Sequence, residues 1–248
     1  MQYSLLSVAT LLGAAAAIPQ GKTAAGAPHS QLNAASGPPK GDIDSSNWCG
    51  AVTSVPDVRT VEATWVVPTA SSPAGSTTYW NYQWIGIDGV NDCGVLLQGG
   101  TGFTTNDPNS GDIEYYFWYE FYPADPVFPG DLVVQPGDTV YIKVTATSTT
   151  TGTIYTENIS RGTSRSYDIT SENGPLCLKY AEYITEDPGD RLPFAAFTDY
   201  DMTSCRATDG NGSSYDLSNP QMWYLDYYGQ DKCDATIESG SDIRFNYH

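Results

Sequence analysis

Short runs of β-branched and aromatic residues alternate along most of the chain with clusters of Gly, Pro, Asn and Asp. This pattern is typical of β-strands joined by turns, and amphipathic helical periodicity is nearly absent. The pattern predicts strands at 59–67, 79–87, 95–98, 113–122, 132–134, 139–145, 154–159, 166–169, 179–185, 195–202, 222–227 and 243–247.

The number and spacing of these strands predict an all-β domain, an antiparallel β-sandwich or jelly roll with two packed sheets. A Pro-Gly-Asp turn at 136–138 predicts a hairpin between the strands at 132–134 and 139–145. The chain has 6 Trp and 18 Tyr, more than a core of this size requires. We therefore expect some of these rings to line a groove.

The first 41 residues differ in composition from the rest. An apolar run from Leu5 to Ile18 is too short to cross a bilayer and contains small residues at 14–17, which predicts a signal peptide at 1–18. Residues 19–41, rich in Gly, Ala, Ser and Pro, predict a leader or short pro-segment. Residues 42–248 then form the single predicted domain of a secreted, extracellular protein.

The predicted domain is strongly acidic. All 29 acidic residues but only 9 of the 11 basic ones lie beyond residue 41, which gives this part a net charge of −20. Such a surface disfavours nucleic acid and membranes as partners. Crowded carboxylates raise one another's pKa, and a group with a raised pKa contributes stability that is lost as the pH rises. We therefore expect a protein adapted to acid surroundings.

Five cysteines in an exported chain predict disulfides with one thiol left over. Their wide spacing, without a Cys-x-x-Cys pair, disfavours a zinc knuckle. Two Asn-x-Ser/Thr sequons predict glycosylation at Asn158 and Asn211.

The positions of the two histidines restrict the possible chemistry. His29 lies in the leader and His248 is the last residue, so neither a Ser-His-Asp triad nor His-ligated zinc is credible. No glycine-rich phosphate loop follows a strand and opens a helix. Carboxylate chemistry remains, and we expect no metal, cofactor or obligate partner, and a monomer.

Four motifs occur in order along the domain: WIGIDG at 84–89, LLQGG at 96–100, WYEFYP at 118–123 and AEYITED at 181–187. Together they resemble the eqolisin family, the fungal glutamic peptidases, from about residue 47 to the C-terminus. The resemblance implies a concanavalin-like fold of two packed antiparallel sheets with the active site on a concave face. It also implies hydrolysis of protein or peptide substrates, insensitive to pepstatin.

The resemblance implies a catalytic pair, Glu186 and Gln98. It further implies that four neighbours line or support the cleft: Trp84, Asp88, Trp118 and Glu120. Matching cysteines imply a Cys93–Cys177 disulfide. We further expect a bond between Cys205 and Cys233, which leaves Cys49 unpaired.

The chain departs from the family pattern at three positions. Tyr116 stands where an acid is usual, Phe121 where Trp is usual, and Cys49 where a small residue is usual. These departures leave the subsite preference and the route of activation open.

The expected pair also makes chemical sense. Peptide hydrolysis needs an activated water, a stabilised oxyanion and a proton for the leaving amine. Glu186 can act as base and then as acid, and the Gln98 NH₂ can donate to the oxyanion. Strand alternation places Glu182 and Glu186 on one face, and likewise Trp118 and Glu120.

Two other functions fit part of the pattern. A jelly-roll glycoside hydrolase would use Glu120 and Glu186 as its two carboxylates and would not require Gln98. A carbohydrate-binding sandwich without catalysis would use the aromatic excess and the acidic surface, with or without calcium, but would leave the ordered motifs unexplained.

Overall fold

The computed structural model describes residues 42–71, 79–107, 112–188 and 194–248. The predicted signal peptide and leader lie outside the described residues. Within the described ranges, no helix has the length and hydrophobicity needed to span a membrane.

The regular secondary structure of the described residues consists of β-strands, as predicted, apart from one short 3₁₀ helix. The elements are β1 (Ile43–Ser45), β2 (Trp48–Ser54), β3 (Val58–Val66), β4 (Ala70–Ser71), β5 (Trp80–Asp88), β6 (Leu96–Asp107), β7 (Asp112–Tyr122), β8 (Thr139–Ala146), β9 (Thr151–Asn158), η1 (Ile159–Arg161), β10 (Thr163–Thr170), β11 (Tyr180–Glu186), β12 (Ala196–Phe197), β13 (Tyr200–Asp209), β14 (Ser214–Tyr215), β15 (Gln221–Asp226), β16 (Asp231–Ser239) and β17 (Asp242–Tyr247).

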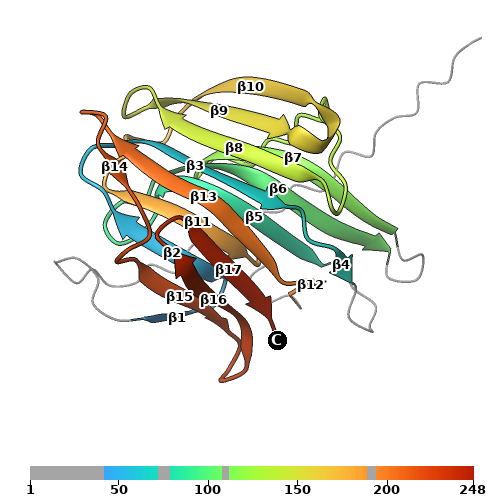
Figure 1. Cartoon of the computed structure of the whole chain (residues 1–248). Helices are drawn as coiled ribbons and strands as arrows, with labels where there is room; N and C mark the ends of the chain where they lie inside the picture. Colours follow the sequence, from blue (N-terminus) through green and yellow to red (C-terminus); the bar gives the residue numbers. More distant parts are fainter. Residues whose placement is uncertain (1–41, 72–78, 108–111, 189–193) are drawn as a thin grey trace, which may run out of the picture.

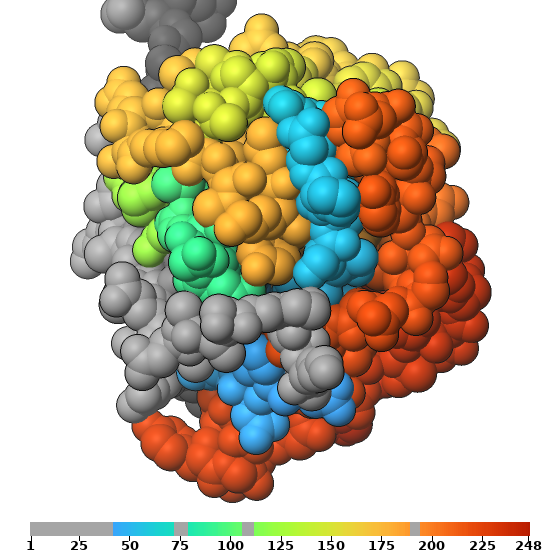
Figure 2. Space-filling view, turned by 90° about the vertical axis from the view of Figure 1, so that its left-hand side faces the viewer, coloured from blue at the N-terminus to red at the C-terminus, as the bar shows by residue number. Residues whose placement is uncertain are grey.

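Fifteen of these strands hydrogen-bond into one sheet. Its order is β10-β9-β8-β3-β13-β17-β16-β15-β2-β11-β5-β6-β7, with β1 beside β15 and β14 beside β13. The parallel pair β1–β15 joins the two ends of the described chain, and Figure 2 shows the blue N-terminal residues against the orange-red C-terminal strands. The small pair β4–β12 is separate.

The large sheet folds back on itself, so that β3 and β8 face β5 and β6 (Figure 1). The two end strands of the sheet, β7 and β10, also approach each other. Their contact includes the stacked rings of Tyr119 on β7 and Tyr167 on β10, whose centroids are 4.9 Å apart. The two predicted sheets are therefore two layers of one strongly curved antiparallel sheet, nearly closed into a barrel-like sandwich. The two layers are continuous because hydrogen-bonded strands connect them. These connecting strands are, in sheet order, β13, β17, β16, β15 and β2.

The main core fills the space between these layers. Along β8, Val140, Ile142 and Val144 are buried while the residues between them are partly exposed, as a strand with one covered face requires. Trp65 on β3 crosses the core, and its indole Nε1 donates to Thr101 Oγ1 on β6 at 3.0 Å. Each large apolar side chain buried here contributes roughly 1.5–3 kcal/mol.

The predicted hairpin at 132–145 is wrong. Leu132 and Val134 are buried, but the backbone around them forms no strand, and β8 pairs instead with β3 and β9. The apolar pattern therefore marks a loop that packs on the core. The Pro-Gly-Asp turn is present, with Gly137 at φ 84, and leads into β8 alone.

Several strand boundaries also differ from the prediction. The segment 195–202 splits into β12 and the start of β13, and β2 and β16 were not predicted. The predicted strand 95–98 extends through a glycine-rich stretch to the end of β6. A Cβ on Gly100 would lie 1.9 Å from the Gln83 carbonyl oxygen, so glycine is required there by the close approach of β5.

The structure confirms one expected disulfide and corrects the other. Cys93 is bonded to Cys177, as the resemblance implied. Cys49 on β2 is bonded to Cys233 on β16, and Cys205 is the free, buried thiol, so the expected Cys205–Cys233 bond is wrong. Strands β2 and β16 flank β15, and the curvature of the sheet brings the two Cα atoms to 5.9 Å.

We expect the double variant Cys49→Ala/Cys233→Ala to lose about 2–5 kcal/mol of unfolding free energy, because this bond closes a very long loop. Urea denaturation measures the loss. Labelling of the denatured, unreduced chain provides the control for the pairing: the thiol reagent should be found on the peptide of Cys205. Labelling of Cys49 instead would contradict the pairing.

Candidate functional site

A row of polar side chains crosses the face of the sheet opposite the main core. The register pairs Glu182 on β11 with Gly86 on β5, Gly86 with Gln98 on β6, and Gln98 with Glu120 on β7. Paired residues of neighbouring strands point to the same side of a sheet. Residues from four separate segments of the sequence are thus brought into one line.

Two further rows run beside the first on the same face. The second row is displaced from the first by two residues along the strands, and the third is displaced by two more. The second carries apolar side chains, and the third carries a carboxylate among aromatic rings. In strand order from β2 to β7, the second row is Gly50, Ile184, Trp84, Gly100 and Trp118, and the third is Trp48, Glu186, Tyr82, Gly102 and Tyr116.

Glu186 lies at the end of β11 and is only 6% exposed. The indole Nε1 of Trp84 donates to its Oε2 at 2.7 Å, and the Asn47 amide donates to its Oε1 at 3.4 Å. Burial raises the pKa of Glu186 to about 7, and hydrogen bonds from Trp48, Trp84 and Asn47 oppose that rise. The site therefore holds a carboxyl group that can exchange its proton in mildly acidic to neutral water.

Gln98 and Glu120 form a hydrogen-bonded pair across β6 and β7. Gln98 Nε2 donates to Glu120 Oε2 at 2.6 Å. Burial raises the pKa of Glu120 to about 8, and the negative charge of Glu186 adds to the rise. The amide of Gln98 cannot titrate, so it can offer N–H donors at any pH.

The structure brings Glu186 and Gln98 onto one face, with Trp84 in the row between them. The expectation that Glu182 and Glu186 share a face is confirmed by the register, as is that for Trp118 and Glu120.

The two expected cleft tryptophans lie beneath the surface. Trp84 and Trp118 are 0% and 1% exposed, so they support the site from below. Trp84 holds Glu186 directly. Trp118 donates from Nε1 to the Thr101 carbonyl at 3.0 Å, and its ring packs on Tyr82 with centroids 4.5 Å apart.

Asp88 anchors the chain that leads into β11. This residue is buried, has a φ of 69°, and accepts backbone N–H groups from Leu178 at 2.6 Å, Lys179 at 2.8 Å and Tyr180 at 3.2 Å. Because β11 carries Glu186, this contact helps to fix the catalytic candidate in the sheet.

Sequence reasoning missed several members of the site. Asn47 and Trp48 were not placed because β2 was not predicted. Glu182 was placed on the correct face, but its surroundings were not: it is 0% exposed, and neither carboxylate oxygen has a hydrogen-bond partner among the described residues. Burial raises the pKa of Glu182 well above its ordinary value, and the charges of Asp88 and Glu186 add to the rise.

The two predicted glycosylation sites differ in environment. Asn211 is exposed. Asn158 is 0% exposed, and its Nδ2, the atom that would carry a glycan, donates to the Val133 carbonyl at 3.0 Å and to Asp138 Oδ2 at 2.8 Å. This geometry is incompatible with a glycan on Asn158.

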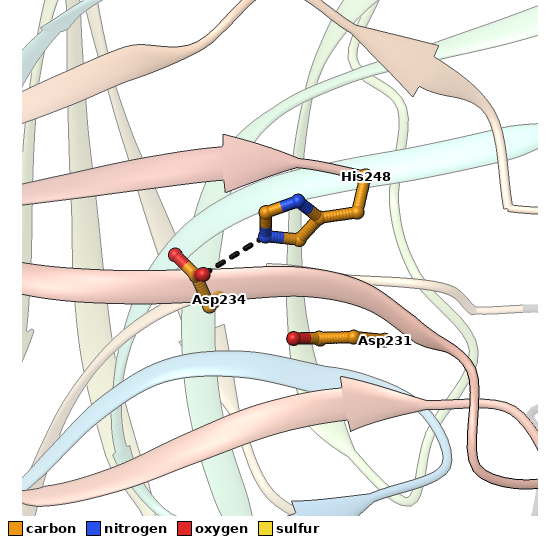
Figure 3. A group of neighbouring side chains, drawn as sticks. All are labelled: Asp231, Asp234 and His248. Atoms are coloured by element: carbon orange, nitrogen blue, oxygen red, sulfur yellow. Dashed lines mark hydrogen bonds and ion pairs between the residues drawn. The ribbon is translucent and has the colours of Figure 1, made fainter.

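Among the described residues, one group of side chains, outside the three rows, could ligate a metal ion. The donor atoms of Asp231, Asp234 and His248 lie within 4.8 Å of one another at the surface (Figure 3). His248 Nε2 and Asp234 Oδ2 lie 2.8 Å apart, and this contact explains why these two side chains are close to each other without a metal ion. No residue of the three rows belongs to this group, and we assign it no role in the site.

A groove of about 820 Å³ lies elsewhere, lined among others by Glu62, Tyr141 and Arg206. It contains none of the predicted site residues. The buried carboxyl and amide groups of the three rows, rather than this groove, therefore define the candidate site.

Comparison with known proteins shows which family the chain resembles as a whole. The model of the peptidase A4 family matches residues 46–247. Scytalidopepsin B of Scytalidium lignicola is 34% identical over 213 residues, which cover 82% of this chain and 78% of that protein. Aspergillopepsin-2 of Aspergillus niger is 30% identical over 224 residues, with the same shares. A crystal structure of scytalido-glutamic peptidase with a transition state analog inhibitor has a TM-score of 0.71 at 32% identity, covering 82% of this chain and 98% of that one.

Proposed function

Because the chain belongs to the peptidase A4, or eqolisin, family and is a glutamic endopeptidase, we propose that it hydrolyses peptide bonds with Glu186 and Gln98. The observation that carries the proposal is that Glu186 and Gln98 lie on the same face of the sheet. Trp84 lies in the row between them and is hydrogen-bonded to Glu186.

Glu186 takes a proton from a water molecule while the water oxygen attacks the carbonyl carbon of the peptide bond. The same carboxyl group then gives that proton to the amide nitrogen as the C–N bond breaks, so the amine leaves neutral and Glu186 returns to its starting state. Trp84 donates to Glu186 Oε2 and thereby fixes the orientation of the carboxyl group for both steps.

Gln98 stabilises the negative charge that develops on the carbonyl oxygen. Its NH₂ group donates to the oxyanion, and because the side chain is only 2% exposed, water competes little for that hydrogen bond. A donor in this role is worth roughly 10²–10³ in turnover.

Family membership favours peptide substrates over the two sugar-directed functions. We further propose that the protein is secreted and acts in acid surroundings as a monomer, without a cofactor. Support for acid surroundings comes from the net charge of −20 beyond residue 41 and from two buried carboxyl groups, apart from the proposed base, whose pKa is raised: Glu120 and Glu182.

The proposal is tested by incubating the protein, after removal of residues 1–41, with a denatured protein substrate from pH 3 to pH 8. Pepstatin is present to suppress aspartic peptidases. We expect new peptides cut at internal bonds, identified by mass spectrometry, and no release of reducing sugar from a polysaccharide panel. Sugar release without proteolysis would contradict the proposal and favour the glycoside hydrolase.

A further inference from the structure

Glu120 and Gln98 face each other as a directly paired couple, and both are shielded from water. They are 7% and 2% exposed, and Gln98 Nε2 lies 2.6 Å from Glu120 Oε2. An amide and a carboxyl group can be joined in two ways: an ionised carboxylate accepts from the amide nitrogen, and a protonated carboxyl group donates to the amide oxygen. The pair can therefore also hold a carboxyl group that carries a proton and donates it.

The other atom of the Gln98 amide supports the same conclusion. Gln98 Oε1 is buried and has no hydrogen-bond partner among the described residues. A half-turn of the amide exchanges its nitrogen and oxygen positions with almost no change in shape. After that half-turn, Oε1 can accept from a protonated Glu120, and both N–H groups are free of this contact.

We propose that Glu120 is a positioning residue that acts in its neutral form, donating its O–H to Gln98 Oε1 and so turning the Gln98 NH₂ towards the substrate carbonyl. This inference rests on the proposed role of Gln98 as the oxyanion donor. An ionised Glu120 can only accept, so it holds the Gln98 nitrogen and draws the amide into the opposite orientation.

The groups around Glu120 favour its neutral form. Burial is the largest cause, and the charges of Glu186 on β11 and Asp125 in the loop after β7 raise its pKa further. The phenol of Tyr82 on β5 also faces these acids. Glu186 differs because indole and amide N–H donors stabilise its carboxylate. The environment therefore favours a proton on Glu120 while Glu186 ionises to act as base.

The test compares kcat and KM of the wild type with those of Glu120→Gln and Glu120→Leu from pH 3 to pH 9. The Gln variant should keep kcat within about tenfold, because its NH₂ can donate to Gln98 Oε1 as the neutral acid does. In the wild type, kcat should decline at the high-pH end of the range as Glu120 ionises. The Gln variant cannot ionise at this position and should not show that decline. The Leu variant should lose roughly 10²-fold in kcat with little change in KM. Samples returned to the starting pH must recover their rate, which separates titration from unfolding.

Three results would overturn the inference: a Gln variant as inactive as the Leu variant at every pH, a Leu variant as active as the wild type, or the same high-pH decline in the wild type and the Gln variant. The comparison of the wild type with the Gln variant at high pH tests the inference even if the Leu variant does not fold. Gln98→Ala in the same series separates the two proposals. If Gln98→Ala is active, the proposed function fails; if it is inactive while Glu120→Leu is fully active, only the role of Glu120 fails.

Discussion

Glu186→Gln should lower kcat by roughly 10³-fold or more while the protein stays folded, because one carboxyl group serves both proton transfers. The substitution keeps the size of the side chain and an oxygen that can accept from Trp84 Nε1. It removes only the ability to take up and release a proton. Steady-state kinetics on a quenched fluorescent peptide measures the loss, and a thermal melt at acid pH confirms the fold.

Asp187→Asn provides the matched control for Glu186→Gln. Asp187 is the next residue and is equally shielded, but its carboxylate accepts a hydrogen bond from the Tyr227 hydroxyl. We expect this variant to keep its rate within about tenfold. A Glu186→Gln enzyme within tenfold of the wild type would contradict the assignment of the base.

The stability of the protein should fall steeply as the pH rises, with Glu182 as a principal cause. Burial raises the pKa of this carboxyl well above its ordinary value of 4.5. A raised pKa in the folded state means that the contribution of Glu182 is fully present below about pH 4.5 and is lost as the pH rises towards the folded value. Each such group lowers the unfolding free energy by about 1.4 kcal/mol per pH unit in that range.

Urea denaturation at pH 4, 6 and 8 measures this slope. Glu182→Gln, which cannot ionise, should lose less stability than the wild type between pH 4 and pH 8. Glu172→Gln at an exposed position should leave the slope unchanged. Wild-type protein that is more stable at pH 8 than at pH 4 would contradict the prediction.

The strands predicted correctly are those whose composition reflects one covered face. In β8, β-branched and small residues alternate with polar ones, and the predicted strand 139–145 differs from the observed strand by one residue. The incorrect predictions concern segments in which the alternation of apolar and polar residues does not match the backbone structure. β2 is buried on both faces and contains Gly50 and Cys49, so it shows no alternation. Leu132 and Val134 have the alternation of a strand but belong to a loop packed on the core.

The site could be predicted only in part for a similar reason. Motifs in the sequence indicated Glu186 and Gln98 as individual residues. The Gln98–Glu120 pair depends on the register of β6 and β7, and the isolation of Glu182 depends on how its neighbours cover it. The Cys49–Cys233 bond follows from the curvature around β15. These are properties of strand pairing over long distances, which local composition does not encode.

The most direct test of the Glu186–Gln98 pair is a double-mutant cycle of kcat/KM on one peptide, with Glu186→Gln, Gln98→Ala and the double variant. If both groups act in the same transition state, each single variant should lose roughly 10²-fold or more, and the double variant should be little worse than Glu186→Gln. A Gln98→Ala enzyme as active as the wild type, with its fold confirmed, would contradict the account.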